Sequence, residues 1–344
     1  MSGESNQFEV RRIRAGTLDH QRAMRDILGL HKPPGRPAQA SPATGPGTSV
    51  RRPAAPVDLL IGGYRRDELV SACLAIESPG AAALVFVPAH LETDGQYRAN
   101  VLVLKALQTI AWERSICLLE VLVPPGSDST RRALDEAGFR YLTQLQYLKR
   151  QETRRRIPHG VRNEEREGAA ESRSPRLVTR VSLPSRALNA ATDLEWVSYT
   201  PDLEPLFQEA VERTYVQSLD CPELTDLRST ANVLAGHRAT GIFDPALWRV
   251  ARRREEPVGV MLLNRIPSET ALEVVYMGVA QVARGTGVAD ALLQWAVQTA
   301  AHVSLTTLAL AVDERNAPAL RLYRRWGFVD TGVRDAWIAS SPPT

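Results

Sequence analysis

The sequence predicts an α/β protein built from two tandem domains. Three observations support this fold class. Apolar strand-like segments alternate with helix-like segments along the chain, and such alternation gives layers of helices on a sheet. The chain has 344 residues, enough for two domains. A segment of the first half also recurs in the second half.

The internal repeat is strongest around two helix-like segments. Residues 94–112 align without gaps with residues 284–302, at an offset of 190 residues, and seven pairs are identical. Random pairing over this window gives roughly one or two identities. Residues 132–139 match residues 321–328 at an offset of 189, and both segments end in Gly-Phe. The chain is therefore expected to contain the same scaffold twice.

The first copy is assigned to residues 1–150. Its expected strands are 8–13, 58–64, 68–76, 82–87 and 116–123, and its expected helices are 18–28 and 99–112. Residues 31–57 are dense in Pro, Ala, Gly and Ser, a composition that cannot bury enough apolar surface to order itself, so we expect a disordered insertion. Residues 151–175 are mostly charged and polar and are expected to link the domains.

The second copy is assigned to residues 176–344. Its expected strands are 194–199, 248–252, 258–264, 273–279 and 307–313, and its expected helices are 203–216, 225–238, 288–301 and a last one beginning at residue 317. Between the fourth strand and the third helix lies the turn Arg284-Gly-Thr-Gly-Val-Ala289.

This turn has the features of an anion site. Gly285 and Gly287 lack the Cβ atoms that would keep an anion from the backbone, and they allow positive φ. The helix that follows presents free N–H groups and the positive end of its dipole. Arg284 adds a permanent charge with donors suited to phosphate oxygens. An ordinary glycine-rich strand-to-helix turn remains the alternative.

Two other phosphate loops fit less well. A P-loop closes with Gly-Lys-Ser/Thr, whereas Gly287 is followed by Val and Ala. A dinucleotide-binding fingerprint requires a third small residue where Asp290 stands, although Asp313 could serve as its acidic residue.

The segment Arg284-x-x-Gly287-x-Ala289 resembles the acyl-CoA signature of the GCN5-related N-acetyltransferases (GNAT), Arg/Gln-x-x-Gly-x-Gly/Ala. The resemblance extends over roughly residues 190–340 in order and spacing. The segments flanking the turn look most like the catalytic half of mycothiol synthase, itself a tandem member. The resemblance implies two GNAT-like domains, each a twisted mixed β-sheet flanked by helices, and an acyl-CoA-dependent N-acetyltransferase whose C-terminal copy is catalytic.

The resemblance also assigns residues to the donor, acetyl-CoA. The backbone amides of the turn would hold the pyrophosphate, the end of the preceding strand would pair with the pantetheine arm, and a side-chain amide would touch that arm. The residues at these positions are Met277, Gly278, Val279, Arg284, Gly285, Thr286, Gly287, Val288, Ala289 and Asn316. Asn316 could equally cap the helix that begins at Ala317.

Two residues stand where family members keep acid–base groups. Tyr323 occupies the position of a phenol that protonates the departing thiolate, and a pKa near 10 makes it a competent acid for that group. Glu273 occupies the position of a carboxylate that deprotonates the substrate ammonium, directly or through water. Tyr323 could otherwise be a core residue, and Glu273 a solvent-facing acid at a strand start.

The first copy lacks these chemical groups. Arg284, Gly287, Asn316, Tyr323 and Glu273 are replaced there by Asp94, Tyr97, Ser127, Leu134 and Ala81, respectively. Asp94 places a negative charge where a pyrophosphate would bind, and the Tyr97 side chain crowds the backbone. We therefore interpret the first copy as non-catalytic, packing against the catalytic half and walling its cleft.

In this family the connection between the first two helices borders the acceptor pocket. Here it includes Asp220 and Glu223, which could receive a cationic amine. An ordinary helix-connecting loop is the alternative. The acceptor is expected to be a small-molecule amine or a peptide, and its identity cannot be inferred from the sequence.

Composition narrows the remaining classes. Cys73, Cys117 and Cys221 are unclustered, which is typical of reduced thiols in a cytoplasmic protein. The six histidines lack ligand spacing, so no metal site is expected. No apolar run is long enough to span a membrane. The net charge of +3 is small, and the arginine clusters lie at the terminus and in the linker, so no nucleic-acid face is expected.

The function most consistent with these features is transfer of an acetyl group from acetyl-CoA to a primary amine. A non-catalytic acyl-CoA-binding or regulatory module is the alternative that shares the phosphate turn but does not need Glu273 or Tyr323. A nucleic-acid-binding protein that uses the arginine-rich tail and linker is a third possibility.

Overall fold

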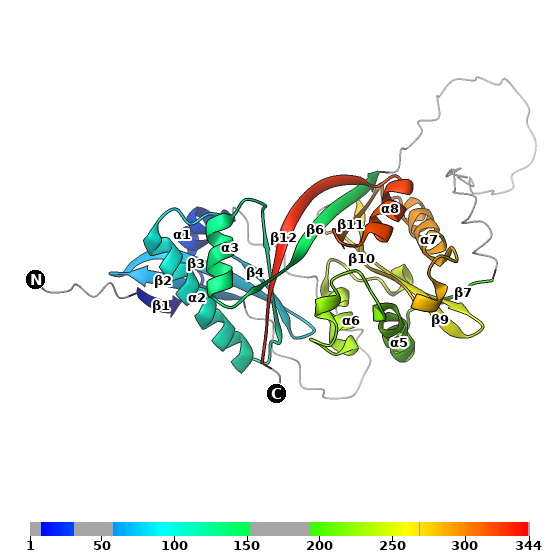
Figure 1. The fold of residues 1–344 in the computed structure, drawn as a ribbon, viewed down its shortest axis with the longest axis horizontal. Helices are drawn as coiled ribbons and strands as arrows, with labels where there is room; N and C mark the ends of the chain where they lie inside the picture. Colours follow the sequence, from blue (N-terminus) through cyan, green and yellow to red (C-terminus); the bar gives the residue numbers. More distant parts are fainter. Residues whose placement is uncertain (1–7, 31–57, 152–192, 268, 343–344) are drawn as a thin grey trace, which may run out of the picture.

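The computed structural model describes residues 8–30, 58–151, 193–267 and 269–342. The strands of these residues form one 12-stranded sheet in the order β1-β2-β3-β4-β5-β12-β6-β11-β10-β9-β8-β7 (Figure 1). The first half contributes the strands β1 (Phe8–Arg12), β2 (Leu59–Arg65), β3 (Glu68–Ser78), β4 (Ala82–Phe86), β5 (Leu118–Val123) and β6 (Arg140–Gln151). Its helices are α1 (Leu18–Arg22), η1 (Ala23–Ile27), α2 (Asp94–Glu113) and α3 (Asp128–Glu136).

The second half contributes the remaining elements. Its strands are β7 (Glu195–Ser198), β8 (Trp248–Arg253), β9 (Glu256–Arg265), β10 (Ala271–Val279), β11 (Thr307–Asp313) and β12 (Val329–Ser340). Its helices are α5 (Glu204–Tyr215), α6 (Thr230–Ala239), α7 (Val288–His302) and α8 (Ala317–Arg325), with the short 3-10 turns η2 (Pro201–Leu203), η3 (Pro222–Leu224), η4 (Pro245–Leu247) and η5 (Gln281–Ala283).

The predicted tandem α/β fold is confirmed. The succession β4-α2-β5-α3-β6 in the first half matches β10-α7-β11-α8-β12 in the second. In both halves the strands on either side of the long helix pair in parallel, β4 with β5 and β10 with β11. The neighbouring pairs are antiparallel, so the sheet is mixed.

The two halves exchange their last strands. The final strand of the first half, β6, pairs with β11 of the second half, and β12 pairs with β5 of the first. Figure 1 shows these two long strands running side by side between the halves. The sequence did not predict this exchange, because it depends on where two similar sheets meet. As a consequence, residues of the first half lie directly beside the parallel strand pair of the second.

Helices cover both faces of the second half. Leu262 and Leu263 are consecutive residues of β9, both fully buried, and belong to different apolar clusters. Leu263 lies in the cluster formed with α7 and α8, whereas Leu262 packs with α5 and α6. Because successive strand residues point to opposite faces, the helix pairs α7/α8 and α5/α6 lie on opposite sides of the sheet.

Local signals explain where some helices differ from their predicted limits. The helix α2 begins at Asp94 rather than near residue 99, because Thr93 and Gln96 form a reciprocal capping box. The helix α6 begins at Thr230 rather than 225, where Ser229 accepts a hydrogen bond from the Asn232 amide. None of the helices in the described ranges is both long and apolar enough to cross a bilayer.

Two sequence predictions fall on parts of the chain that the structure does not describe. The insertion at 31–57 lies wholly outside the described residues, and the linker at 151–175 lies outside them except for Gln151. The domain limits 1–150 and 176–344 therefore stay predictions.

Candidate active site

A cavity opens where two parallel strands separate. β10 and β11 pair only between Ala271–Glu273 and Thr307–Ala309. Beyond Glu273, β10 continues to Val279 paired with β9, and its other edge has no strand partner in the described sheet. A cavity of about 1040 Å³ lies there, with Val274–Val279 on one side and Leu310–Val312 on the other.

Most of the residues predicted for the site line this cavity. They are Met277, Gly278, Val279, Arg284, Gly285, Gly287, Ala289, Asn316, Tyr323 and Asp220. Glu273, Thr286, Val288 and Glu223 are not among its lining residues. Val288 is fully buried in the apolar core beneath α7, so its side chain supports the turn from inside.

The geometry of β10 shapes the cavity wall. The register with β9 shifts between Val274 and Tyr276, which is a β-bulge beside the cavity. At Gly278 a Cβ atom would lie 2.5 Å from the hydroxyl oxygen of Thr214 on α5, so only glycine allows this close approach of helix and strand. The same Thr214 hydroxyl lies 2.6 Å from the Tyr276 hydroxyl, which joins α5 to the strand.

The turn before α7 keeps the conformation that its glycines predict. Gly285 and Gly287 have φ of 77° and 91°, and Gly287 is the N-cap of α7 without a side-chain cap. The amides at this helix start therefore have no side-chain cap, and Gly285, Gly287 and Ala289 line the cavity beside them. In the first copy, the capping box of Thr93 and Gln96 occupies the corresponding helix start. Of these two helix starts, only that of α7 lacks a side-chain cap.

The negative charge in the first turn of α7 is neutralised. Asp290 is buried and accepts hydrogen bonds from Arg325, at 2.7 Å, and from the indole of Trp326, at 2.8 Å. These contacts also fix α8 against α7. Asp290 therefore adds no unpaired charge that would repel an anion from this helix start.

Arg284 has contacts that the sequence did not predict. Its guanidinium donates to the backbone carbonyls of Thr214, Val216 and Gln217, at 2.8–3.1 Å, and its Nε donates to the carbonyl of Val279. These carbonyls lie at the C-terminal end of α5, where helix carbonyls lack partners. Arg284 thus ties the end of α5 to the turn while lining the cavity.

Tyr323 projects from α8 to the edge of β10. Its side chain is buried, and its hydroxyl lies 3.8 Å from the sulfur of Met277. Burial raises the pKa of Tyr323 above its ordinary value, and the charge of Asp220 raises it further. The phenol is consequently protonated at neutral pH and available as a proton donor.

Glu273 lies at the last paired position before the strands separate. Its side chain is half-buried, and desolvation raises its pKa, with a further increase from the nearby Glu269. A carboxylate with a raised pKa is a stronger base than one in water. Tyr147, on β6 of the first half, has a pKa that desolvation raises and that the Glu273 charge also raises.

The two acidic residues of the α5–α6 connection have different environments. Asp220 lines the cavity and accepts a hydrogen bond from the Asp313 amide at 3.0 Å. Desolvation raises the pKa of Asp220. Glu223 instead receives both terminal nitrogens of Arg315, at 2.6 and 2.9 Å, which lowers its pKa. Glu223 is therefore engaged in an ion pair, and only Asp220 faces the cavity.

Asn316 caps the helix α8, as one of the two sequence interpretations predicted. Its side-chain oxygen accepts a hydrogen bond from the Ala319 amide at the start of α8. Its side chain also hydrogen bonds with Asp220 and lines the cavity. Capping the helix does not move Asn316 away from the cavity. The contact with the donor arm that the family resemblance implies therefore stays a prediction.

Sequence reasoning missed an aromatic wall. Tyr215 and Tyr276 line the cavity with ring centroids 6.1 Å apart, edge to face. His237 lies against Tyr276 at 5.4 Å, and burial lowers its pKa to about 4, so the imidazole is neutral. No sequence motif marks these residues, because they meet only when α5, α6 and β10 pack together.

Across the described residues, no three His, Cys, Asp or Glu side chains are grouped so as to hold a metal ion.

Comparison with known proteins agrees with this geometry. Residues 205–328 match the family model described as acetyltransferase (GNAT) family. This part of the chain is therefore similar to the GNAT family. It contains the separating strands, the glycine turn and Tyr323, and proteins of this family catalyse acyl transfer. No curated protein sequence is significantly similar to the chain.

Solved structures resemble the chain at low sequence identity. A GCN5-related N-acetyltransferase from Sphaerobacter thermophilus is 18% identical, covering 83% of this chain and 81% of its own, with a TM-score of 0.49. A tandem GNAT protein from the clavulanic acid biosynthesis pathway is 13% identical, covering 98% and 100%, with a TM-score of 0.45. The glucosamine N-acetyltransferase region of a fungal multi-domain GH3 β-N-acetylglucosaminidase is 14% identical, covering 96% of this chain and 38% of its own, with a TM-score of 0.55. The last likeness extends the shared fold to both halves.

Proposed function

We propose that the second half transfers an acetyl group from acetyl-CoA to a primary amine. The observation that carries the proposal is the cavity between β10 and β11, which brings a buried phenol to the unpaired edge of a strand and has a glycine turn on its border. An extended arm of the donor would lie along the free edge of β10. The open amides before α7 would receive its pyrophosphate.

The reaction requires one proton to leave the amine and one to reach the sulfur. Glu273 accepts the proton of the acceptor ammonium, directly or through water. The amine nitrogen then forms a bond to the thioester carbonyl carbon, and the carbon–sulfur bond breaks. Tyr323 supplies the proton to the leaving thiolate. The raised pKa values of both groups favour these roles, because Glu273 becomes a better base and Tyr323 stays protonated until the thiolate forms.

Asp220 is the acidic group best placed to attract the cationic acceptor. It lines the cavity, whereas Glu223 is paired with Arg315. Asp290, the other carboxylate on the cavity wall, is paired with Arg325. Of these three carboxylates, Asp220 alone has no cationic side chain paired with it. An ammonium group entering the cavity would therefore bind Asp220.

The test is an acetyl-CoA consumption assay against a panel of primary amines and lysine-containing peptides. We expect at least one acceptor to release CoA with stoichiometric acetylation of the amine, detected by mass spectrometry. The rate should fall in Glu273→Gln and in Tyr323→Phe. Binding of CoA without turnover for any amine would instead favour the non-catalytic acyl-CoA-binding module, which does not need these two residues.

A further inference from the structure

Residues 217–229, which lie between α5 and α6, form what we call the acceptor loop. It begins at the cavity, where Gln217, Ser218, Leu219 and Asp220 are lining residues. It then turns sharply at Cys221, a non-glycine residue with φ of 45°. Such a backbone conformation is costly for a residue with a Cβ atom, so surrounding contacts must hold the loop in this shape.

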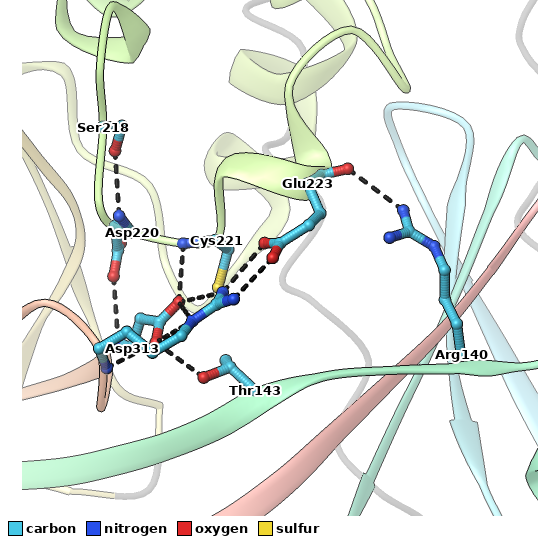
Figure 2. A network of polar contacts seen from close by, with 8 residues as sticks. Arg140, Thr143, Ser218, Asp220, Cys221, Glu223 and Asp313 are labelled. Atoms are coloured by element: carbon cyan, nitrogen blue, oxygen red, sulfur yellow. Dashed lines mark hydrogen bonds and ion pairs between the residues drawn. The ribbon is translucent and has the colours of Figure 1, made fainter.

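A polar anchor connects this loop to the first half. Thr143, on β6, donates a hydrogen bond to Asp313 at 2.7 Å, and both side chains are buried (Figure 2). The other carboxylate oxygen of Asp313 accepts the Cys221 amide at 3.0 Å, while the Asp313 amide donates to Asp220 at 3.0 Å. A hydroxyl of the first half therefore orients the Asp313 carboxylate that holds Cys221, and the backbone amide of the same Asp313 holds the preceding residue, Asp220.

A second polar anchor lies one turn further along the loop. Arg315 binds both carboxylate oxygens of Glu223, and Arg140 of β6 donates to the Glu223 carbonyl at 3.3 Å. Figure 2 shows the Arg140 side chain extending from its strand toward Glu223. Both first-half residues of the two anchors come from the exchanged strand.

Apolar contacts also hold the loop in place. Cys221, Leu224 and Leu227 pack into a cluster built by the sheet between the halves. The other members of that cluster are Ala82, Leu118, Leu122, Leu142, Leu145, Ala336 and Ile338. Beyond the loop, Gly80 of the first half lies so close to α6 that a Cβ atom would be 2.0 Å from the Asn232 carbonyl oxygen.

We propose that the first half is the seat of the acceptor loop, with Thr143 as a positioning residue that acts through Asp313 to hold Asp220 at the cavity wall. The acceptor side of the site is thus built by both halves, although the acid–base groups belong to the second. The assignment of this side of the cavity to the acceptor rests on the proposed function. The inference that the first half holds the loop in place depends only on the contacts described above.

The reactivity of one thiol in the loop, that of Cys221, measures how firmly the loop is held. Cys221 is half-exposed and packs in the interface cluster, and Cys117, half-exposed in the first half, serves as an internal reference. Alkylation of each thiol by iodoacetamide can be followed by peptide mass spectrometry in the full chain. We expect Thr143→Val to accelerate alkylation of Cys221 about tenfold, because a buried hydrogen bond to a carboxylate is lost. Cys117 should react at its wild-type rate.

Two controls separate seating from general loosening. Thr143→Ser restores the hydroxyl and should return Cys221 to within about twofold of its wild-type rate. Thr130→Val removes an equally buried hydroxyl of the first half, one that donates to the Pro88 carbonyl, and should leave Cys221 unchanged. Equal acceleration of Cys117 and Cys221 in Thr143→Val would overturn a role specific to the loop.

A backbone pair gives an independent measurement. Gly80→Ala and Gly126→Ala introduce a Cβ at similar positive φ, 95° and 83°, but only the first meets a neighbouring atom, on α6. We expect alkylation of Cys221 to be faster than in the wild type in Gly80→Ala but not in Gly126→Ala. Wild-type alkylation of Cys221 in both Thr143→Val and Gly80→Ala would overturn the proposal.

Calorimetry with CoA distinguishes this inference from the proposed function. The Thr143→Val protein should bind CoA within about twofold of wild type, because the glycine turn is not part of the seat. Absence of CoA binding by the wild-type protein would refute the proposed function and leave the alkylation result standing. Loss of CoA binding in Thr143→Val alone would refute a role confined to the acceptor side.

Discussion

The hydroxyl of Tyr323 lies 3.8 Å from the sulfur of Met277, across the space between α8 and the free edge of β10. The phenol therefore reaches the wall along which an extended donor would lie. Burial raises the pKa of the phenol above its ordinary value. A thiolate formed at this point would find a protonated group beside it.

Replacing Tyr323 by Phe should lower kcat for acetyl transfer about 100-fold, since general acid catalysis contributes at least that factor. Affinity for CoA, measured by calorimetry, should stay within about twofold, because the ring and its packing are retained. Tyr141→Phe removes a phenol from an exposed position of the first half and is the matched control. Unchanged turnover in Tyr323→Phe would remove the residue from the mechanism.

Gly287→Ala should weaken CoA binding about tenfold. The substitution places a Cβ at φ of 91°, which strains the turn by roughly 1–2 kcal/mol and moves the amides before α7. Gly327→Ala introduces the same strain at φ of 81°, with no atom within 4 Å of the new Cβ, outside the cavity lining. Calorimetry should show a loss of affinity for the first variant and none for the second. Equal affinities would refute the pyrophosphate site.

The parts of the site that the sequence predicted are those encoded locally. The glycine turn, the helix after it and the cap at Asn316 depend on residues within a few positions of one another, and they occur as expected. The internal repeat likewise predicted two copies of one scaffold, because a repeat encodes the same local structure twice. Tyr323 could be placed on a helix by spacing, and the fold then brought it to β10.

The remaining features depend on contacts between segments distant in sequence. The exchange of β6 and β12 follows from the meeting of two sheets, which no local pattern encodes. The carbonyl contacts of Arg284 and the ion pair of Glu223 with Arg315 arise only when the acceptor loop is placed. For the same reason the sequence treated Glu223 and Asp220 alike, whereas the fold separates them.

Glu273→Gln should abolish the acidic limb of the pH–rate profile. A general base works when deprotonated, and desolvation raises the pKa of Glu273 above its ordinary value. In the wild type, kcat/KM for the amine should therefore fall as the pH decreases through that raised pKa. The Gln variant should be slower at every pH and should lack this inflection. If Asp220→Asn removed the inflection instead, the base would be Asp220, whose pKa is also raised.

Arg284→Met should loosen the end of α5. The guanidinium donates to three carbonyls there, and methionine keeps the apolar stem but no donor. Hydrogen–deuterium exchange of residues 215–220 should accelerate about tenfold. Arg213→Met, which removes a half-exposed arginine of the same helix paired with Glu209 and Glu256, should leave that exchange unchanged. Unaltered exchange with weaker CoA binding would indicate that Arg284 acts on the phosphate alone.

Asp313→Asn should destabilise the protein in a pH-dependent manner. Burial acts to raise the pKa of Asp313, but hydrogen bonds from Arg315, Thr143 and backbone amides outweigh it, so the pKa is lowered. A carboxylate with a folded pKa below its unfolded value stabilises the fold above the unfolded pKa, near 3.9. That contribution is lost as the pH falls through the lowered folded pKa.

The free energy of unfolding of Asp313→Asn should consequently be about 2 kcal/mol lower than wild type at pH 7, because the buried carboxylate of Asp313 would lose charge-assisted hydrogen bonds. The difference should shrink as the pH falls below about 4. Urea titrations across this range measure both quantities. Asp330→Asn, at an exposed residue paired with Arg324 at 3.4 Å, should show little difference at any pH. A constant deficit for Asp313→Asn at all pH values would mean that its role is packing rather than charge, and would weaken the view that this carboxylate joins the two halves.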